Sequence, residues 1–352
     1  MRDPNGSSRM SDTKIRNMEE FAALVGISRP TVSKYFQDPE SVRPSTRQRI
    51  EVALKRCDYR PNIFAVNQNR KLTKIVGIVV PYLADPFFAE IARQLERRCI
   101  DAGFRPALYS AHGQPDLEID VLDGLRLLKP AGVLLAPLGR ISHRPAIKQF
   151  CNEVPTVLFD SNMDGIGEAF VGSDNFSFVS QTVDYLTRTG EPPCFFEMKT
   201  PANPNANKRR IAYYKMMEQL GFEPNLYSIE GTGWAFEEIG RKGALDILDK
   251  GGFSTNTVLC SNDRLGIGLL SACYERGLRV GRDTGCDLRV ASHDDHPFSR
   301  FTCPSLTTAA HDYDAVANHA FSTLTDLIEA GGKFDQRAEM LFTPKLVLRS
   351  SA

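Results

Sequence analysis

From residue 75 to residue 291 the sequence alternates short apolar runs with segments of helical length, and this alternation is what most constrains the fold. The first run, 75–80, is continuous, apolar and rich in β-branched residues, and a helical pattern follows it from 87 to about 102. The same alternation resumes after Asp160 and ends with a run at 288–291. Strands that alternate with helices of 10 to 15 residues form parallel β-α-β layers. We therefore expect two similar α/β lobes with parallel sheets.

The carboxyl ends of these strands predict a ligand cleft. Open parallel sheets bind ligands beyond the carboxyl ends of their strands, in the crevice where lobes meet. Carboxylates and amides pair with hydroxyl groups, and aromatic faces pack on rings, so such a cleft favours a saccharide-like or polyol ligand. The alternative is that these acids and amides only cap helices, as Asp174 and Asp263 could do. The polar and aromatic groups at strand ends include Asp85, Phe87, Phe88, Asp160, Asn262, Asp294 and Asp295.

The charges of the chain divide unevenly between its N-terminal part and the rest. Whole-chain charge cancels, with 43 basic and 43 acidic side chains. Residues 14–71 contain 12 Lys and Arg against 6 Asp and Glu, a local charge of +6 that leaves −6 elsewhere. A basic module joined to an acidic body is typical of a small nucleic-acid reader attached to a different kind of domain.

A helix-turn-helix pattern lies inside this basic module. Apolar residues at Met18 and Phe21 share a helical face, and Gly26 then ends the helix and permits a tight turn. Ser28 stands where a helix N-cap belongs, and Pro30 falls in the first turn of the next helix, where its missing N–H does no harm. We expect a second helix around 28–36 with Val32, Tyr35 and Phe36 turned inward.

The outward side of that second helix carries groups suited to DNA. Arg29 can form a forked pair with guanine, Lys34 can contact phosphate, and Thr31 and Ser33 supply hydroxyls. After a loop at 38–44, Ser45-Thr46 is predicted to cap a third helix that runs to about Arg56. Its apolar residues, which can close a three-helix core, are Ile50, Val52, Ala53 and Leu54.

Four ordered motifs in this module resemble the headpiece of the LacI/GalR family of bacterial repressors. They are Gly26-Ile27-Ser28, Thr31-Val32-Ser33, Thr46-Arg47 and Tyr59-x-Pro61-Asn62-x-x-Ala65. The resemblance implies a DNA-binding transcription regulator whose second helix enters the major groove, with Arg29 reading bases. The implied DNA-contacting residues are Ser28, Arg29, Pro30, Thr31, Ser33, Lys34, Thr46, Asn62, Ala65 and Gln68.

The segment after Asn62 departs from that family at one position. The family places there a leucine that wedges into the minor groove, three residues after the alanine of the motif, and this chain has Gln68. A glutamine can hydrogen-bond in the groove but lacks the apolar bulk that unstacks a base step. Residues 67–69 are then either a groove-binding hinge or a polar linker. The sequence leaves both a kinked and an unkinked operator as alternatives.

The body resembles the family's effector domain, which is similar to periplasmic sugar-binding proteins. The matching stretches are Val76-Gly77, Phe159-Asp160, 171–175, 261–263, Asp294-Asp295, 304–308 and 344–350. By this resemblance the effector-binding residues are Asp85, Phe87, Phe88, Asp160, Arg209, Asn262 and Asp294, with Trp234 either lining the cleft or packing. Arg209 is preferred over Arg210, and an arginine there keeps a sugar acid or sugar phosphate possible as ligand. His293 stands where the family often has Tyr or Phe, so it either packs or binds the ligand.

The expected architecture is a small all-α helix-turn-helix headpiece followed by a two-lobed α/β periplasmic-binding-protein-like domain. The expected parts are a disordered tail at 1–13, the headpiece at 14–61, a hinge or linker at 62–73 and the effector domain at 74–349. Lobe 1 is expected at about 74–172 and 309–337, and lobe 2 at about 173–305 and 338–349. The start of the chain has no apolar stretch typical of a secretion signal, and no run approaches the length of a membrane span, so we expect a cytoplasmic protein.

Several function classes are disfavoured by what the sequence lacks. The eight cysteines contain no C-x-x-C pair, and neither a P-loop nor a G-x-S-x-G motif is present, so we expect no metal, no cofactor and no catalytic residue. An enzyme and a periplasmic transport protein are therefore the weaker hypotheses. The favoured one is a homodimeric regulator that acts as a repressor on a pseudo-palindromic operator. Its effector would be a sugar, sugar acid or polyol, and the alternative is a corepressor-dependent regulator that senses a non-sugar metabolite.

Overall fold

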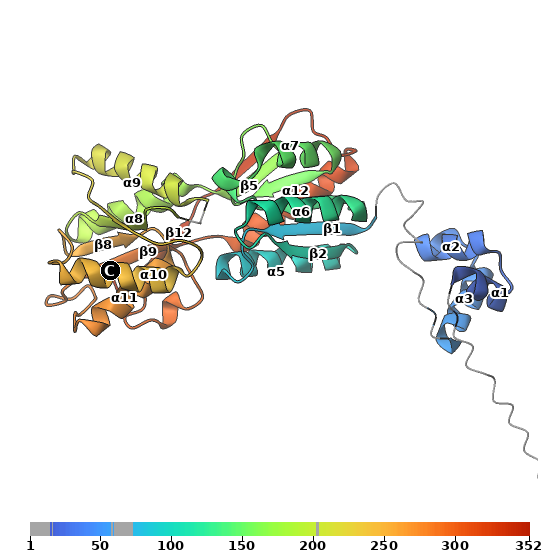
Figure 1. The fold of residues 1–352 in the computed structure, drawn as a ribbon, viewed down its shortest axis with the longest axis horizontal. Coiled ribbons are helices and arrows are strands. Elements are labelled where there is room, and N and C mark those ends of the chain that lie inside the picture. The colour runs from blue at the N-terminus through green and yellow to red at the C-terminus, as the bar shows by residue number, and fades with distance from the viewer. Residues whose placement is uncertain (1–14, 16, 58, 60–72, 202–203) are drawn as a thin grey trace, which may run out of the picture. The chain divides into compact units, whose positions relative to one another are not determined.

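The computed structural model describes residues 15, 17–57, 59, 73–201 and 204–352. The chain forms two compact units, which divide between Thr73 and Lys74 (Figure 1). The first is a small helical unit, and the second contains both sheets. Within the described residues, no helix combines the length and the apolar character needed to cross a bilayer.

The helical unit contains α1 (Met18–Val25), α2 (Arg29–Gln37), the short 3-10 helix η1 (Pro39–Ser41) and α3 (Pro44–Arg56). Asn17 caps α1 by accepting from the Glu20 backbone N–H, and Gly26 ends the helix at φ 66°. A positive φ of this kind is open to glycine without steric cost, which is why the turn occurs here. The expected helix, Gly-containing turn and helix are confirmed.

The core of this unit is small, and two details of the expected third helix are wrong. Val32 and Ile50 are wholly buried, together with Phe21, Ala22 and Tyr59. Helix α3 begins at Pro44 with Arg43 as its N-cap residue, so Ser45-Thr46 lies inside the first turn and does not cap it. A proline at the first helical position is already set to the helical φ, which explains the earlier start. Val52 is 41% exposed and stays outside the core.

The first sheet of the large unit is six-stranded, in the order β11-β5-β4-β3-β1-β2, and every pair in it is parallel. It forms lobe 1 together with helices α5, α6, α7 and α12. The strands are β1 (Ile75–Val80), β2 (Arg105–Ser110), β3 (Gly132–Leu135), β4 (Thr156–Phe159), β5 (Ala169–Ser173) and β11 (Ala338–Phe342). The helices are α5 (Pro86–Asp101), α6 (Pro115–Leu128), α7 (Arg144–Glu153) and α12 (Tyr313–Glu329), with a 3-10 turn η2 (Gly139–Ile141).

The second sheet, in lobe 2, has the order β12-β10-β9-β8-β6-β7. Its pairs are parallel except the edge pair of β12 with β10, which is antiparallel. The strands are β6 (Cys194–Met198), β7 (Leu226–Ile229), β8 (Thr257–Cys260), β9 (Arg289–Asp294), β10 (Thr307–Ala310) and β12 (Lys345–Val347). The helices are α8 (Asn175–Thr189), α9 (Ala206–Leu220), α10 (Phe236–Asp249) and α11 (Asp263–Glu275), with a 3-10 turn η3 (Ser299–Phe301).

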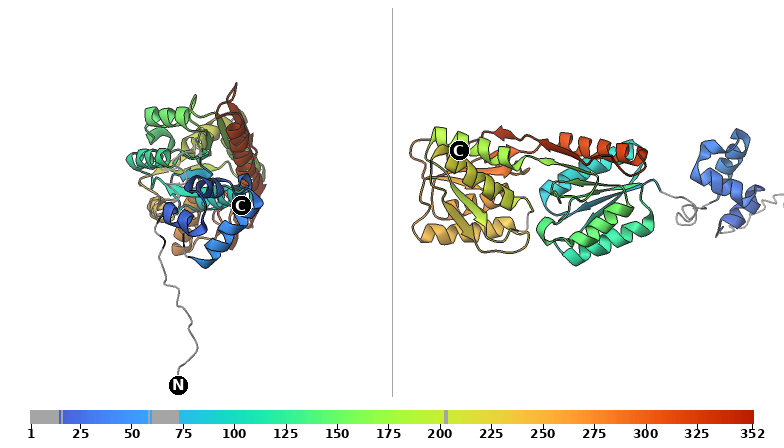
Figure 2. Two further views of the ribbon diagram at one scale, coloured as in Figure 1. Left: turned by 90° about the vertical axis from the view of Figure 1, so that its right-hand side faces the viewer. Right: turned by 90° about the horizontal axis from the view of Figure 1, so that it is seen from above.

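The chain passes between the two lobes three times (Figure 2). It crosses after β5, again after β10 on the way to α12, and finally between β11 and β12. The boundaries therefore differ from those expected from the sequence. Residues 338–342 belong to the first sheet because β11 pairs with β5, and residues 309–310 belong to the second sheet because β10 pairs with β9 and β12.

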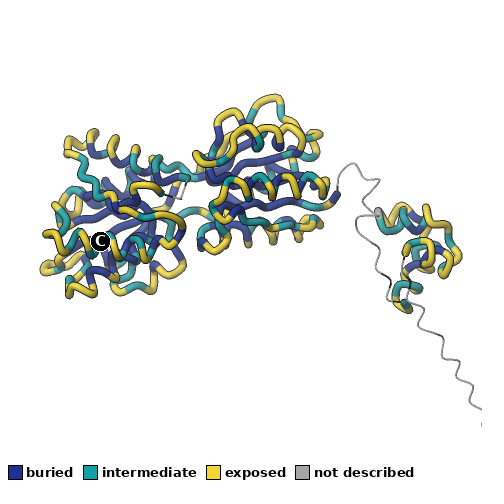
Figure 3. The backbone as a smooth tube through the Cα atoms, in the orientation of Figure 1, coloured by how far each residue is buried: buried dark blue, intermediate teal, exposed yellow. Residues whose placement is uncertain are grey.

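The central strands of both lobes are buried beneath their helices, whereas the edge strands β2, β11 and β12 are partly exposed (Figure 3). Strands β3, β4 and β8 are buried along their whole length. Continuous apolar runs of this kind are typical of strands covered on both faces by helices. The polar side chains at the carboxyl ends of these strands thus lie at the edge of rigid, buried elements.

Candidate functional site

A pocket lies between the lobes, where the carboxyl ends of strands from both sheets meet. It encloses about 430 Å³ of space free of protein atoms, its open mouth included. Its walls carry carboxylates, two guanidinium groups, two imidazoles and aromatic rings. The lining residues are Asp85, Phe87, Asp160, Arg209, Phe236, Asn262, Asp263, Arg264, Asp294, His296, His311 and Tyr313.

Arg209 and Asp294 form a buried ion pair in this pocket. Arg209 Nη2 lies 2.5 Å from Asp294 Oδ1, and Arg209 Nη1 donates to the carbonyl oxygen of Ser261 at 2.7 Å. The Arg209 side chain is only 2% exposed. Burial alone would raise the pKa of Asp294, but the charge of Arg209 and a hydrogen bond with His311 outweigh it and hold that pKa well below its usual range. Asp294 is therefore an acceptor at any physiological pH.

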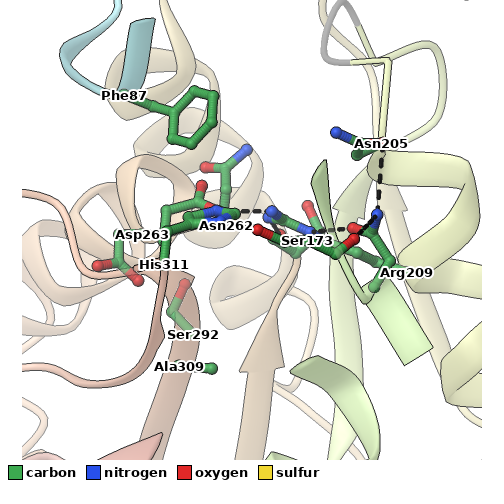
Figure 4. Close-up of polar contacts among 12 residues, drawn as sticks. Phe87, Ser173, Asn205, Arg209, Asn262, Asp263, Ser292, Ala309 and His311 are labelled. Carbon is green, nitrogen blue, oxygen red and sulfur yellow. Dashed lines mark hydrogen bonds and ion pairs between the residues drawn. The ribbon is translucent and has the colours of Figure 1, made fainter. Parts of the chain in front are cut away.

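His311 connects this ion pair to the first crossing between the lobes. Its Nε2 is 3.1 Å from Asp294 Oδ1, and its Nδ1 is 2.7 Å from the hydroxyl of Ser173, the last residue of β5 (Figure 4). Burial lowers the pKa of His311, although the hydrogen bond and charge of Asp294 act in the opposite direction. The ring is therefore neutral near pH 7. It packs between Phe87 and Phe178, whose ring centroids are 4.7 and 4.5 Å away.

Asp160 lies at the end of β4 in lobe 1 and contacts lobe 2. Its carboxylate accepts a hydrogen bond of 2.9 Å from the side-chain amide of Asn205, which also donates to its backbone carbonyl. Asn205 is the residue before α9. Burial raises the pKa of Asp160 to about 7, with Lys208 and Arg209 opposing that shift. Burial also raises the pKa of Asp263 to about 7, so two acids of the pocket change charge near neutral pH.

Asp174 and Asp263, the two acids that the sequence also allowed to be simple helix caps, differ in what they bind. Asp174 caps α8, accepting from the backbone N–H groups of Phe176 and Ser177. Asp263 does not cap a helix, because Asn262 caps α11 through the Leu265 N–H at 2.9 Å. Asp263 instead accepts from the His296 N–H and from two hydroxyls. The amide of Asn262 is therefore both a cap and part of the pocket wall.

Six of the eight residues expected to bind an effector line this pocket. They are Asp85, Phe87, Asp160, Arg209, Asn262 and Asp294. The competing arginine, Arg210, pairs with Glu197 within lobe 2, so the preference for Arg209 agrees with the geometry.

Two of the expected residues are not part of the lining. Phe88 is 1% exposed and belongs to the main apolar core, so placing it in the cleft was wrong. Trp234 is 9% exposed and stacks on Tyr82 at a centroid distance of 5.1 Å, so it packs. His293 also packs: it is wholly buried, and its ring centroid is 6.0 Å from that of Phe178.

Five lining residues were not anticipated from the sequence. His311 and Tyr313 follow the carboxyl end of β10, so the rule that located Asp160 and Asp294 would have found them had the strand been recognised. Arg264 and His296 also follow strand ends closely, those of β8 and β9, so the same rule reaches them. Phe236 opens α10 at a greater distance from β7 and carries no such signal.

The helical unit displays the polar groups of α2 at its surface. Ser28, Arg29, Pro30 and Lys34 are exposed, and Thr31, Ser33 and Thr46 are half-buried. The Ser28 hydroxyl lies 2.8 Å from that of Thr31, so it makes no side-chain cap even though Ser28 occupies the N-cap position. The side chain of Arg29 is 60% exposed and 3.6 Å from a carboxylate oxygen of Glu19. Three further expected DNA contacts, Asn62, Ala65 and Gln68, lie outside the described residues.

Known families match both units of the chain. Residues 17–62 match the family of bacterial regulatory proteins named for lacI, and residues 185–352 match the periplasmic binding protein-like domain. The chain combines a LacI-family helix-turn-helix domain with a periplasmic binding protein-like domain. The first match covers the helix-turn-helix, and the second covers most of lobe 2 together with α12 and β11 of lobe 1. A protein with both parts is a DNA-binding transcription regulator.

Two relatives that cover nearly the whole chain are repressors. The ribose operon repressor of Escherichia coli (strain K12) is 28% identical over 348 residues, covering 95% of this chain and 99% of the repressor. The HTH-type transcriptional repressor CytR of the same strain is 26% identical over 335 residues, covering 95% of each. A crystal structure of the lac repressor dimer bound to operator and the anti-inducer ONPF has a TM-score of 0.81 at 21% identity, covering 96% of this chain and 99% of that one. The fold is Lac repressor-like, and these relatives are regulators rather than enzymes.

Proposed function

We propose that this chain is a sequence-specific repressor whose affinity for its operator is set by a neutral sugar or polyol bound between the lobes. The observation that carries the proposal is the pocket itself, with the buried Arg209–Asp294 pair on one side and Phe87 from the other lobe. Carboxylates accept hydrogen bonds from hydroxyl groups, and an aromatic face packs on the apolar face of a sugar ring.

The charges of the pocket favour a neutral ligand over an anionic one. Four aspartates line the pocket against two arginines. Both guanidinium groups are already paired, Arg209 with Asp294 and Arg264 with Asp85 and Glu237. A carboxylate or phosphate on the ligand would have to displace one of these pairs and would add a negative charge beside the remaining acids. A sugar acid or sugar phosphate is for this reason the weaker candidate.

The names of the relatives support a sugar, and the DNA-binding half of the proposal rests on α2. Ribose is in the name of one repressor, and a complex of a regulator with cellobiose is among the matching folds. In α2, Arg29 is proposed to read bases in the major groove, and Lys34 is proposed to contact phosphate. Because the related lac repressor was crystallised as a dimer on its operator, we propose a two-fold dimer on a pseudo-palindromic site.

A thermal-shift panel on the full chain tests the ligand. Pentoses, hexoses and their reduced polyols would be compared with the corresponding aldonic acids and sugar phosphates. A ligand that binds only the folded state raises the melting temperature, by an amount equivalent to about 2.7 kcal/mol at 100 times its Kd. We expect a rise with at least one neutral member and none with the acid or phosphate of the same sugar.

Adjacent arginines provide the matched control. Arg209→Gln should abolish that rise, because it leaves Asp294 buried without its cation. Arg210→Gln should keep it, because Arg210 pairs with Glu197 away from the pocket. A shift produced only by acids or phosphates, or one that survives Arg209→Gln, would overturn the proposed ligand class.

A further inference from the structure

Arg264 connects the two lobes beside the pocket. It lies in the first turn of α11 in lobe 2, and its side chain is 15% exposed. Its Nη1 donates to Asp85 Oδ2 of lobe 1 at 2.9 Å, and Asp85 is itself only 7% exposed. An ion pair between two such buried groups, one on each lobe, resists separation because parting them would leave unpaired charges in a poorly solvated site.

The orientation of the Arg264 side chain is fixed from within lobe 2. Glu237, near the start of α10, accepts from Arg264 Nε and Nη2, both at 2.7 Å. The ring of Phe236 lies against the guanidinium, with 4.9 Å between the ring centroid and the central carbon. A forked pair and a ring contact together leave the planar group little freedom, so its remaining edge stays directed at Asp85.

A second contact between the lobes joins the same two chain segments. Tyr82, three residues before Asp85, stacks on Trp234, three residues before Glu237, with the ring planes 13° apart. Gly113 in lobe 1 makes this approach possible. Its φ is +71°, and a Cβ built there would be 2.6 Å from the indole nitrogen of Trp234. The aromatic stack and the ion pair therefore hold the segments around 82–85 and 234–237 together.

We propose that Arg264 is a positioning residue that keeps the lobes together around the pocket when no effector is bound. It does so through a cross-lobe clasp formed by Tyr82, Asp85, Trp234 and Arg264. The clasp favours the closed arrangement before an effector binds. An effector can therefore enter only when the clasp opens, and the strength of the clasp sets how easily the pocket opens. This role goes beyond the proposed function, because it concerns the effector-free protein and holds whatever the ligand is.

The only tryptophan of the chain, Trp234, reports on the clasp directly. The experiment measures intrinsic fluorescence and acrylamide quenching of the full chain without any effector. Arg264→Gln should shift the emission maximum to the red and steepen the quenching slope, because the indole loses its cover when the lobes part. Asp85→Asn, on the other lobe, should do the same, since asparagine still caps α5 and removes only the charge.

Three further variants separate a clasp from a local packing effect. The double variant Arg264→Gln/Asp85→Asn should show no more exposure than either single variant, because one contact is being removed. Arg264→Lys, which keeps the charge but not the fork, should lie between the wild type and Arg264→Gln. Arg241→Gln is the matched control, because Arg241 pairs with Glu238 and Glu275, which both belong to lobe 2, and it should leave the fluorescence unchanged.

The proposal is overturned if Asp85→Asn leaves the emission and the quenching of Trp234 as in the wild type. In that case any effect of Arg264→Gln would arise within lobe 2. It is equally overturned if the double variant sums the two single effects. Because no ligand is added, these results do not depend on the outcome of the sugar panel. Should Arg264→Gln fail to fold, Asp85→Asn and Arg264→Lys still decide the matter.

Discussion

Asp160 is one of two buried acids, with Asp263, whose titration should be visible in the stability of the large unit. Burial raises its pKa to about 7, so the folded state holds a proton that the unfolded chain releases near pH 4. The contribution of the Asp160 carboxyl to the free energy of unfolding is fully present below its pKa in the unfolded chain. It is lost as the pH rises through its pKa in the folded state. We expect Asp160→Asn to gain stability relative to wild type between pH 5 and pH 8, since asparagine has no charge to bury and can still accept from Asn205.

The measurement is urea unfolding at pH 5 and at pH 8, followed by Trp234 fluorescence. The difference in unfolding free energy between Asp160→Asn and wild type should grow in favour of the variant at the higher pH. Asp120→Asn, which changes an exposed acid on α6, should show no such growth. A difference that is the same at both pH values would mean that Asp160 is an ordinary ionised carboxylate.

Neighbouring residues show where prediction from sequence stops at the residue scale. Phe87 and Phe88 were both assigned to the cleft, but only Phe87 lines it, while Phe88 is in the core. Successive residues on a helix point about 100° apart, so a motif identifies the turn that faces the ligand without telling which of two adjacent rings does so. Asp160 and Asp294 were located correctly because each stands at the end of a strand, which fixes its position.

At the scale of elements, α3 offers a test of the headpiece core. Ile50 is wholly buried among Phe21, Val32 and Tyr59, whereas Val52 on the same helix is 41% exposed. Ile50→Ala should cost about 2–5 kcal/mol, which is much of the stability of so small a unit, so DNA binding should be lost. Val52→Ala should cost well under about 1 kcal/mol.

Far-UV circular dichroism and gel shift would measure these effects. The melting of the large unit, followed by Trp234, should be unaffected in both variants, because the two units have separate cores. Equal losses of DNA binding in the two variants would contradict the assignment of the core. A fall in the melting temperature of the large unit with Ile50→Ala would contradict the separation of the units.

Most elements were predictable because each has a strong local signal. A continuous apolar run located β1, and Gly26 located the end of α1. Strand β11 was missed, because it lies at the edge of its sheet with nearly every residue exposed and so has no apolar run. The start of α3 was misplaced because a proline at the first position substituted for a side-chain cap.

The organisation of the whole molecule could be inferred only in outline. Alternating strands and helices predicted two α/β lobes, but not that the chain would cross between them after β5, β10 and β11. Strand order is decided by contacts between segments far apart in sequence, and local patterns do not contain it. His311, which connects Asp294 to Ser173 at the first crossing, depends on that order and was therefore not foreseen.

At this scale the central proposal is that binding in the pocket and binding of DNA are coupled. Coupling requires only that the effector bind one arrangement of the chain more tightly than another, and typical coupling free energies are about 1–3 kcal/mol, or about 5- to 150-fold in affinity. Arg209 belongs to the pocket and Arg29 to the surface of α2, so the two activities can be removed separately.

The most direct test is the affinity of the full chain for a DNA duplex selected from a random library, measured by anisotropy with and without the neutral sugar or polyol found in the panel. We predict that the ligand changes the DNA Kd of the wild type about 5-fold or more. Arg209→Gln should bind the same DNA with no response to the ligand. An unchanged DNA Kd in the wild type at saturating ligand, or a chain that selects no DNA sequence, would contradict this account.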